Sequence, residues 1–236
     1  MKILVIDVGG TNIKMLATGQ KDVRKFPSGP KLTAQQMVDG VIKATADWDY
    51  DVVTIGYPGP VVNGKLVLEP HNLGPGWVDF DFAGKFGKPV RLINDAAMQA
   101  LGAYRGGKML FIGLGTGMGS AMVFDGVVAP LELAHLPYKK HTFEDYVGLR
   151  GLERLGKKRW HKAVEDVVDR LEAALVADSV VIGGGNARKL KRLPPGARLG
   201  DNRDAFEGGF RLWQDKARVA SHRGAAKSRT RKPGST

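Results

Sequence analysis

The chain has 236 residues, a formal net charge of +12, and 43% hydrophobic and 25% charged residues, which is ordinary for a globular protein large enough for one large domain or two lobes. It has no cysteine for disulfides or thiolate metal sites and no apolar run long enough to span a membrane. Because Asp7 interrupts the short N-terminal apolar run, a signal peptide is not predicted, and we expect a cytoplasmic protein with no membrane partner.

Residues 2–16 predict a β-hairpin. The apolar run from Ile3 to Ile6 ends at Asp7, a glycine pair follows, and a second apolar run begins directly after it. Glycines let the backbone turn sharply and bring its N–H groups close to phosphate oxygens, and a carboxylate at the strand end suits a hydrated Mg²⁺. An ordinary hairpin remains the alternative. The candidate donor-binding residues are Asp7, Gly9, Gly10, Thr11, Asn12 and Lys14.

The next hundred residues alternate helix, strand and loop. Thr33 predicts a helix start with a capping box to Gln36, and residues 52–55 predict a buried strand that runs into a Pro/Gly loop. Asn63-Gly64 predicts a turn between two short strands. The Pro/Gly loop over residues 70–77 ends on Trp77, whose ring either stacks on a sugar or only packs against its own loop.

A strand at residues 90–93 leads into Asn94-Asp95 and a helix over residues 96–104. Asn and Asp are preferred helix N-caps, so one of them is expected to cap this helix. The alternative is that Asp95 is a general base, because phosphoryl transfer to a hydroxyl needs a carboxylate to accept the proton.

Residues 108–122 repeat the first hairpin. Shifted by 106 positions, Lys108 falls on Lys2 and Gly115 on Gly9, and the apolar positions coincide. Gly113 stands where the first copy has Asp7, so only one copy keeps the carboxylate. Two hairpins of one design suggest two related lobes facing one phosphate chain. The second copy adds Gly115, Thr116 and Gly117 as donor-binding candidates.

The last third of the chain predicts a long amphipathic helix over residues 159–176, from Trp160 through Ala174 and Leu175 on its apolar stripe, and a buried strand at 179–182. A glycine-rich turn follows, with a basic helix predicted after it. Glycines at such a turn let a flat base or a phosphate approach the backbone. The candidates there are Gly183, Gly184, Gly185 and Asn186.

Three motifs occur in order: Asp-x-Gly-Gly-Thr-x-x-Lys at 7–14, Gly-Thr-Gly-x-Gly-Ser at 115–120 and Gly-Gly-Gly-Asn-Ala at 183–187. Over about residues 2–214 the chain resembles the ROK family of sugar kinases and repressors, most closely its polyphosphate glucokinases. The resemblance implies an α/β, two-lobed actin-like ATPase fold, of the ribonuclease H-like, hexokinase type, with the active-site cleft between the lobes. It also implies a homodimer.

The resemblance also implies roles for single residues. Asp95 matches the catalytic base, and the 183–187 motif matches the adenosine site. Ala134 replaces the family's glycine between a sugar-binding Glu and His, but the spacing is intact. Residues 136–143 lack the family's zinc-binding cysteines, so we predict no zinc site. The residues matching sugar contacts are Asn72, Asn94, Glu132, His135 and Glu144.

The resemblance predicts an N-terminal lobe over residues 1–106 with a returning helix at 203–214, and a C-terminal lobe over 107–202. Residues 215–236 hold seven Lys and Arg against one acid and are predicted to be a disordered basic tail. The remaining excess of positive charge clusters at 139–140, 157–159 and 188–192, which either steers an anionic substrate or keeps the surface soluble.

These features predict a glucokinase that transfers a phosphoryl group from polyphosphate, ATP or both to the 6-hydroxyl of glucose with Mg²⁺. The alternatives are an ATP-only kinase for another hexose or aminosugar, and a non-catalytic sugar-sensing regulator. The chain begins at the hairpin, so the DNA-binding segment of ROK repressors is not expected. No specific nucleic-acid partner is predicted, because the basic tail carries no interleaved aromatic residues.

Overall fold

The computed structural model describes residues 1–201, 203–214 and 218–220. Its elements up to residue 103 are β1 (Ile3–Val8), β2 (Asn12–Ala17), β3 (Arg24–Pro27), α1 (Ala34–Ala44), β4 (Val52–Tyr57), β5 (Val61–Val62), β6 (Lys65–Leu66), α2 (Phe82–Phe86), β7 (Val90–Asn94) and α3 (Asp95–Ala103). The later elements are β8 (Met109–Leu114), β9 (Met118–Phe124), β10 (Val127–Leu131), β11 (Pro137–Tyr138), β12 (His141–Thr142), α4 (Phe143–Val147), α5 (Leu149–Leu175), β13 (Ser179–Gly183), the 3₁₀ turn η1 (Ala187–Lys189), β14 (Ala197–Leu199), α6 (Asp204–Arg211) and β15 (Arg218–Val219).

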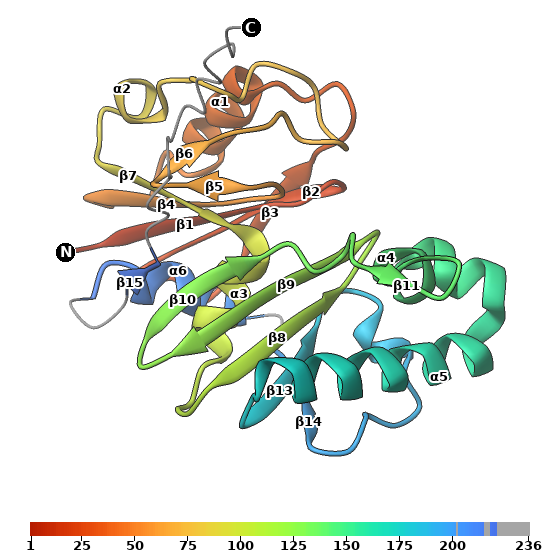
Figure 1. Cartoon of the computed structure of the whole chain (residues 1–236). Coiled ribbons are helices and arrows are strands. Elements are labelled where there is room, and N and C mark those ends of the chain that lie inside the picture. The colour runs from red at the N-terminus through yellow and green to blue at the C-terminus, as the bar shows by residue number, and fades with distance from the viewer. Residues whose placement is uncertain (202, 215–217, 221–236) are drawn as a thin grey trace, which may run out of the picture.

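The strands form two main sheets that are separated by a helical layer. The first sheet has the order β3-β2-β1-β4-β7 and the second the order β14-β13-β8-β9-β10-β15. Figure 1 shows α3 and α6 between the sheets, α1 and α2 on the outer side of the first sheet, and α5 on the outer side of the second. Side chains alternate accordingly, because successive residues of a strand point to opposite faces. Ile3 and Val5 face the middle layer, whereas Leu4 and Ile6 belong to the outer core.

Both predicted hairpins are confirmed, and the repeat extends beyond them. β1 pairs antiparallel with β2, and β8 pairs in the same way with β9. The backbone N–H of Lys2 donates to Asp51 Oδ2 at 2.7 Å, and that of Lys108 donates to Asp178 Oδ2 at 2.7 Å. In return, the amide of Asp51 donates to Lys2 O and that of Asp178 to Lys108 O, both at 2.8 Å. Each hairpin is thus fastened to its neighbouring parallel strand by the same clasp.

The helix predictions hold in part. Thr33 and Gln36 form the predicted capping box of α1. α5 begins ten residues earlier than expected and is kinked at Gly156, where φ is +71°. Ala174 is exposed and does not belong to the core. The basic helix predicted after residue 187 is wrong, because only the three-residue turn η1 forms. Crowded positive charge and two prolines at 194–195 do not favour a longer helix there.

The helical layer depends on glycine. A Cβ on Gly102 of α3 would lie 1.8 Å from the backbone oxygen of Asp204, and a Cβ on Gly208 of α6 would lie 1.8 Å from that of Met98. The two helix backbones therefore touch directly. The hydroxyl of the buried Thr54 in β4 donates to the Gly209 carbonyl at 2.9 Å, so α6 is also fixed to the first sheet.

The predicted lobe boundaries stay a prediction. Of the predicted tail, residues 215–217 and 221–236 lie outside the described residues, whereas Arg218–Val219 form β15 and pair in parallel with β10 instead of being disordered. Within the described ranges, no helix combines the length and the apolar composition needed to cross a membrane.

Candidate active site

The tip of the first hairpin presents two consecutive backbone donors. Gly9 uses its own N–H inside the turn, on Asn12 O at 3.1 Å, whereas the amides of Gly10 and Thr11 have no hydrogen-bond partner among the described residues. Ser28 fixes this tip from the neighbouring strand: its hydroxyl donates to Gly9 O at 2.5 Å and its amide to Thr11 O at 3.0 Å. Consecutive free N–H groups in a rigid turn suit an anion.

The second hairpin repeats this arrangement at the equivalent positions. Gly115 donates its N–H inside the turn to Gly117 O at 3.0 Å. In the described part of the chain, the amides of Thr116 and Gly117 have no partner. A shift of 106 positions maps Gly10 onto Thr116, so the same pair of amides is left free in both copies.

Asp7 and Lys14 are register partners on β1 and β2, and Lys14 Nζ lies 3.2 Å from Asp7 Oδ2. The Asp7 side chain is 14% exposed and the Lys14 side chain 47% exposed. Lys14 thus neutralises part of the charge on Asp7 and keeps its remaining ammonium N–H groups near the tip. Both residues were predicted to serve the phosphate donor, and that role stays a prediction.

The sequence left open whether Asn94 or Asp95 caps the helix α3, and in the structure the cap is Asn94. Asn94 caps α3, because its side-chain oxygen accepts from the Ala97 N–H at 3.0 Å while its amide donates to Gly59 O at 3.1 Å. Asp95, the first residue of α3, is not needed for this cap. One of its oxygens accepts from the Ala96 N–H at 2.8 Å.

The surroundings of Asp95 shift its proton affinity. Although the residue keeps some exposed surface, its carboxyl group lies deep in the protein, and loss of hydration raises its pKa to about 7. The negative charges of Asp7 and then Glu132 act in the same direction, whereas the hydrogen bond from Ala96 opposes them. A carboxylate with a pKa near neutrality is suited to accept and release a proton at physiological pH.

Asp95 lies between the two hairpins. Strand register places it near the first hairpin, because Asp7 pairs with Gly56 and Gly56 pairs with Ile93, two residues before Asp95. Its neighbour Ala96 contacts the second hairpin, since a Cβ on Gly119 of β9 would lie 2.8 Å from the Ala96 Cβ. The start of α3, which carries Asp95, is therefore packed near both hairpins.

The donor set beside the first tip fits Mg²⁺. Within the described ranges, no three His, Cys, Asp or Glu side chains cluster as they would in a cage for a metal ion. Mg²⁺ needs no such cage, because it keeps several waters and takes one or two carboxylates together with phosphate oxygens. The negative charges of Asp7 and Glu132 both act on Asp95, so a cation is favourable near these carboxylates.

The glycine-rich turn after β13 lies against the second hairpin. Asn186 is buried, and its side-chain amide donates to Gly115 O at 2.8 Å while its backbone N–H donates to Leu114 O at 2.9 Å. Gly184 has φ of +82°, and a Cβ there would meet the Leu114 carbonyl oxygen at 2.5 Å. The structure therefore brings Gly183–Asn186 to the Gly115 side of the tip.

The loop over residues 70–77 approaches the first tip through Asn72, whose Cβ lies 3.4 Å from where a Gly10 Cβ would stand. Trp77 is fully buried, so it cannot stack on a sugar. Its ring packs instead against Tyr57 and Phe82, at centroid distances of 5.7 and 6.3 Å. Of the two alternatives for Trp77, the sugar platform is wrong because the ring belongs to the outer core.

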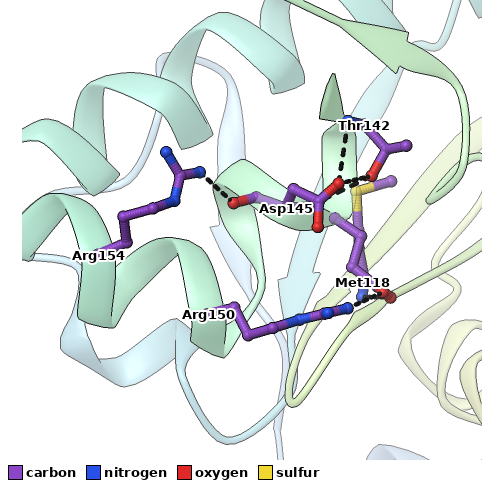
Figure 2. A network of polar contacts seen from close by, with 6 residues as sticks. Met118, Thr142, Asp145, Arg150 and Arg154 are labelled. Carbon is purple, nitrogen blue, oxygen red and sulfur yellow. Dashed lines mark hydrogen bonds and ion pairs between the residues drawn. The ribbon is translucent and has the colours of Figure 1, made fainter. Parts of the chain in front are cut away.

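The remaining sugar-contact candidates differ in how firmly they are held. Glu132 and His135 are exposed, and Glu132 is close enough to raise the pKa of Asp95. Glu144 is partly buried: its Oε2 accepts from the Met118 N–H at 3.3 Å and its Oε1 from Arg150 at 3.2 Å. Figure 2 shows this network around α4 and the start of α5. Glu144 thus contacts the second tip directly, which its position in the sequence did not predict.

Sequence reasoning missed two groups of residues near the site. The first is Ser28, which anchors the first tip; its place in a Pro-Ser-Gly-Pro segment after a strand was a usable turn signal. The second is the pair Arg150 and Arg154, which lie four residues apart on one helix face. No signal marked them, because the helix was expected to begin only at residue 159.

Comparison with known proteins adds independent findings. The ROK family model matches residues 3–130. The chain is 28% identical over 215 residues to the polyphosphate glucokinase of Mycobacterium leprae, covering 80% of this chain and 65% of that protein. It is 29% identical over 215 residues to the polyphosphate glucokinase of Mycobacterium tuberculosis (strain CDC 1551 / Oshkosh), covering 80% of each.

Among solved structures, the inorganic polyphosphate/ATP-glucomannokinase of Arthrobacter sp. strain KM superposes with a TM-score of 0.75 at 24% identity, over 88% of this chain and 96% of that one. This likeness confirms the predicted fold, a two-lobed actin-like ATPase fold with mixed α/β sheets. The chain spans about two thirds of the length of the M. leprae relative.

Proposed function

Since the chain belongs to the ROK family, we propose that it is a hexose kinase that transfers a phosphoryl group from polyphosphate or ATP to the 6-hydroxyl of glucose. The observation that supports this proposal is that the start of α3, with Asp95, packs near both hairpins, whose tips each have two consecutive amides without a partner among the described residues. The names of the two mycobacterial relatives and of the Arthrobacter structure support the sugar and both donors.

In the proposed reaction, the oxygen of the sugar hydroxyl bonds to the terminal phosphorus of the donor, and Asp95 accepts the proton of that hydroxyl. The bond from that phosphorus to the bridging oxygen breaks, and the shortened donor leaves. Amides of Gly10, Thr11, Thr116 and Gly117 bind the phosphate oxygens, where charge is spread in the transition state. Bound near Asp7, Mg²⁺ would supply neutralisation of phosphate charge.

The sugar is proposed to contact Asn72, Asn94, Glu132, His135 and Glu144. Asn94 is held by its cap and by Gly59, so its free amide hydrogen is fixed in direction. Glu144 is held by Met118 and Arg150. Side chains that are already held in one position can orient a sugar hydroxyl without losing further conformational entropy when the sugar binds.

The assay is sugar 6-phosphate formation from glucose and Mg²⁺, with ATP and polyphosphate as parallel donors. Product with either donor supports the kinase, and product with both supports the full proposal. Mannose and N-acetylmannosamine in parallel assays decide the acceptor. A wild type that phosphorylates no sugar with either donor would contradict the proposal and favour a sugar-sensing regulator.

The pKa of Asp95 predicts the pH dependence. A base must be deprotonated to act, so kcat/KM for glucose should fall as the pH drops below about 7. Asp7→Asn should move this acid limb to lower pH, because of the two neighbouring carboxylates Asp7 has the larger effect on the pKa of Asp95. Glu132→Gln should move it less. A profile that stays flat from pH 8 to about pH 5 would contradict Asp95 as the base.

A further inference from the structure

A basic concavity lies on the outer side of the second hairpin tip. It is lined by His141, Asp145, Arg150 and Arg154, and we call these four residues the distal pocket. Figure 2 shows Arg150 and Arg154 extending from α5 toward α4, on either side of Asp145. The side chains of His141, Arg150 and Arg154 are exposed. Arg150 also holds Glu144 of the site described above, whereas His141 and Arg154 are given no role in the proposed reaction.

The distal pocket is joined to the hairpin tip by one side chain. Glu144 accepts from the Met118 N–H with one oxygen and from Arg150 with the other, at 3.3 and 3.2 Å. It lies so close to the tip that a Cβ on Gly117 would stand 2.1 Å from Glu144 Oε2. Arg150 is therefore joined to the tip through Glu144, and Arg154 follows one helical turn later, about 6 Å along the axis.

The pocket is pre-organised. Arg154 donates to the backbone oxygen of Asp145 at 2.7 Å, and its guanidinium stacks 4.9 Å from the ring centre of Tyr146. The Asp145 carboxylate is occupied by Thr142, which donates its amide at 3.2 Å and its hydroxyl at 2.7 Å. In the part of the chain that the structure describes, Arg154 forms no ion pair. Its charge is thus fixed in place but not neutralised.

Different groups of residues flank the Gly115 side and the Gly117 side of the second hairpin tip. On the Gly115 side, Asn186 holds the glycine-rich turn that matches the adenosine motif. On the Gly117 side, Glu144 leads to Arg150 and Arg154. If a nucleotide places its base at the glycine-rich turn over 183–186, its phosphates end at the hairpin tip and none extends to Arg150 and Arg154. A linear polyphosphate has no base and carries negative charge along its whole length.

We propose that the distal pocket binds the distal phosphates of an inorganic polyphosphate donor, with Arg154 as a specificity-determining residue that ATP does not contact. This inference rests on the proposed polyphosphate-using kinase and names how that donor is held. Arginine suits the role, because its planar fork donates two parallel hydrogen bonds to phosphate oxygens.

The test is calorimetric binding of two probes, long-chain polyphosphate and tripolyphosphate, to the full chain and to Arg154→Gln. We expect the variant to bind the long chain about tenfold more weakly and to bind tripolyphosphate like the wild type, because a short chain bound at the tip does not reach Arg154. Arg154→Lys keeps the charge without the fork and should fall between the two. In turnover, the ratio of KM for long-chain polyphosphate to KM for ATP should rise about tenfold in Arg154→Gln.

Arg159→Gln is the matched control. It removes the same charge from α5, but Arg159 is exposed and, among the described residues, its side chain bonds to Leu155 O of its own helix, outside the pocket. An equal loss in Arg159→Gln, an equal loss for both chain lengths, or a wild type that binds both lengths equally or not at all would overturn the proposal. Tighter, Arg154-dependent binding of a single-stranded DNA oligonucleotide would overturn it in favour of nucleic acid.

This outcome is separable from that of the proposed function. A wild type that binds long chains through Arg154 but phosphorylates no sugar would contradict the kinase and leave the anion subsite standing. A wild type that phosphorylates glucose from ATP without any chain-length effect would support the kinase and remove the subsite.

Discussion

Asp95→Asn should lower kcat for glucose phosphorylation by about 10²–10⁴-fold, the usual contribution of a general base. Asparagine has the same shape and keeps an oxygen for the Ala96 N–H, so the start of α3 should be unchanged. What it loses is the ability to accept a proton. The measurement is kcat at pH 8 together with the dissociation constant for glucose, which we expect to change little.

Asp125→Asn is the control for this substitution. Asp125 is exposed in the β9–β10 turn with φ of +50°, a conformation that asparagine tolerates equally well. It should retain full activity. An Asp95→Asn protein with kcat within a few fold of the wild type would exclude Asp95 as the base.

Asp95→Asn should also change stability in a pH-dependent way. Because folding raises the pKa of Asp95, the folded state binds its proton more tightly than the unfolded chain does. The contribution of Asp95 to the free energy of unfolding should therefore fall as the pH rises from about 4 to about 7, and stay low above that. The variant lacks this loss, so it should be about 1–3 kcal/mol more stable at pH 8, allowing for partial exposure, and equal near pH 4. Denaturant unfolding at both pH values measures the difference.

Gly208→Ala should destabilise the protein by about 3 kcal/mol. The added Cβ would lie 1.8 Å from the Met98 oxygen and 2.9 Å from the Gly102 nitrogen. Both are backbone atoms, so no side-chain rotation relieves the contact and α6 must move off α3. The better helix propensity of alanine offsets only about 1 kcal/mol. Urea unfolding followed by far-UV circular dichroism measures the loss.

Glu207→Ala is the control on the same helix. Glu207 is exposed and pairs only with Arg211, four residues on, so its removal should change stability by about 0.5 kcal/mol or less. If Gly208→Ala is as stable as Glu207→Ala, the direct backbone contact between α3 and α6 is not present in solution.

Local signals predicted the parts of the fold that local chemistry determines. Thr33 and Gln36 sit at capping-box spacing, and glycines after an apolar run predicted both hairpins. The match between residues 2–16 and 108–122, which lie 106 positions apart, predicted that the two hairpins have the same design. The clasp of Lys2 with Asp51 was not predictable, because the two residues lie 49 positions apart and no pattern joins them.

The candidate site was predicted best where one segment carries the chemistry. Asp7 was proposed from its place at a strand end, whereas the strand-end position of Asn94 and Asp95 left helix capping open beside catalysis, and their roles in the site came from the family resemblance and stay predictions. The position of Glu144 against the second tip arises from packing between α4 and β9, which periodicity does not encode. The sequence left two alternatives for Trp77, a sugar platform or packing against its own loop, and could not decide between them because its packing partners Tyr57 and Phe82 belong to other elements.

The late position of α6 constrains when the first half of the chain can fold. Its Gly209 backbone accepts from Thr54, and Trp213 donates to the same hydroxyl at 2.8 Å, across 155 and 159 residues of sequence. While the chain emerges from the ribosome, the first sheet is complete in sequence at residue 94 and α3 follows at once, yet the part of the inner face that α6 covers stays open until α6 has been synthesised. Translation therefore leaves part of this apolar face exposed until about residue 204, and nascent chains halted before that residue should require chaperones to stay free of aggregates.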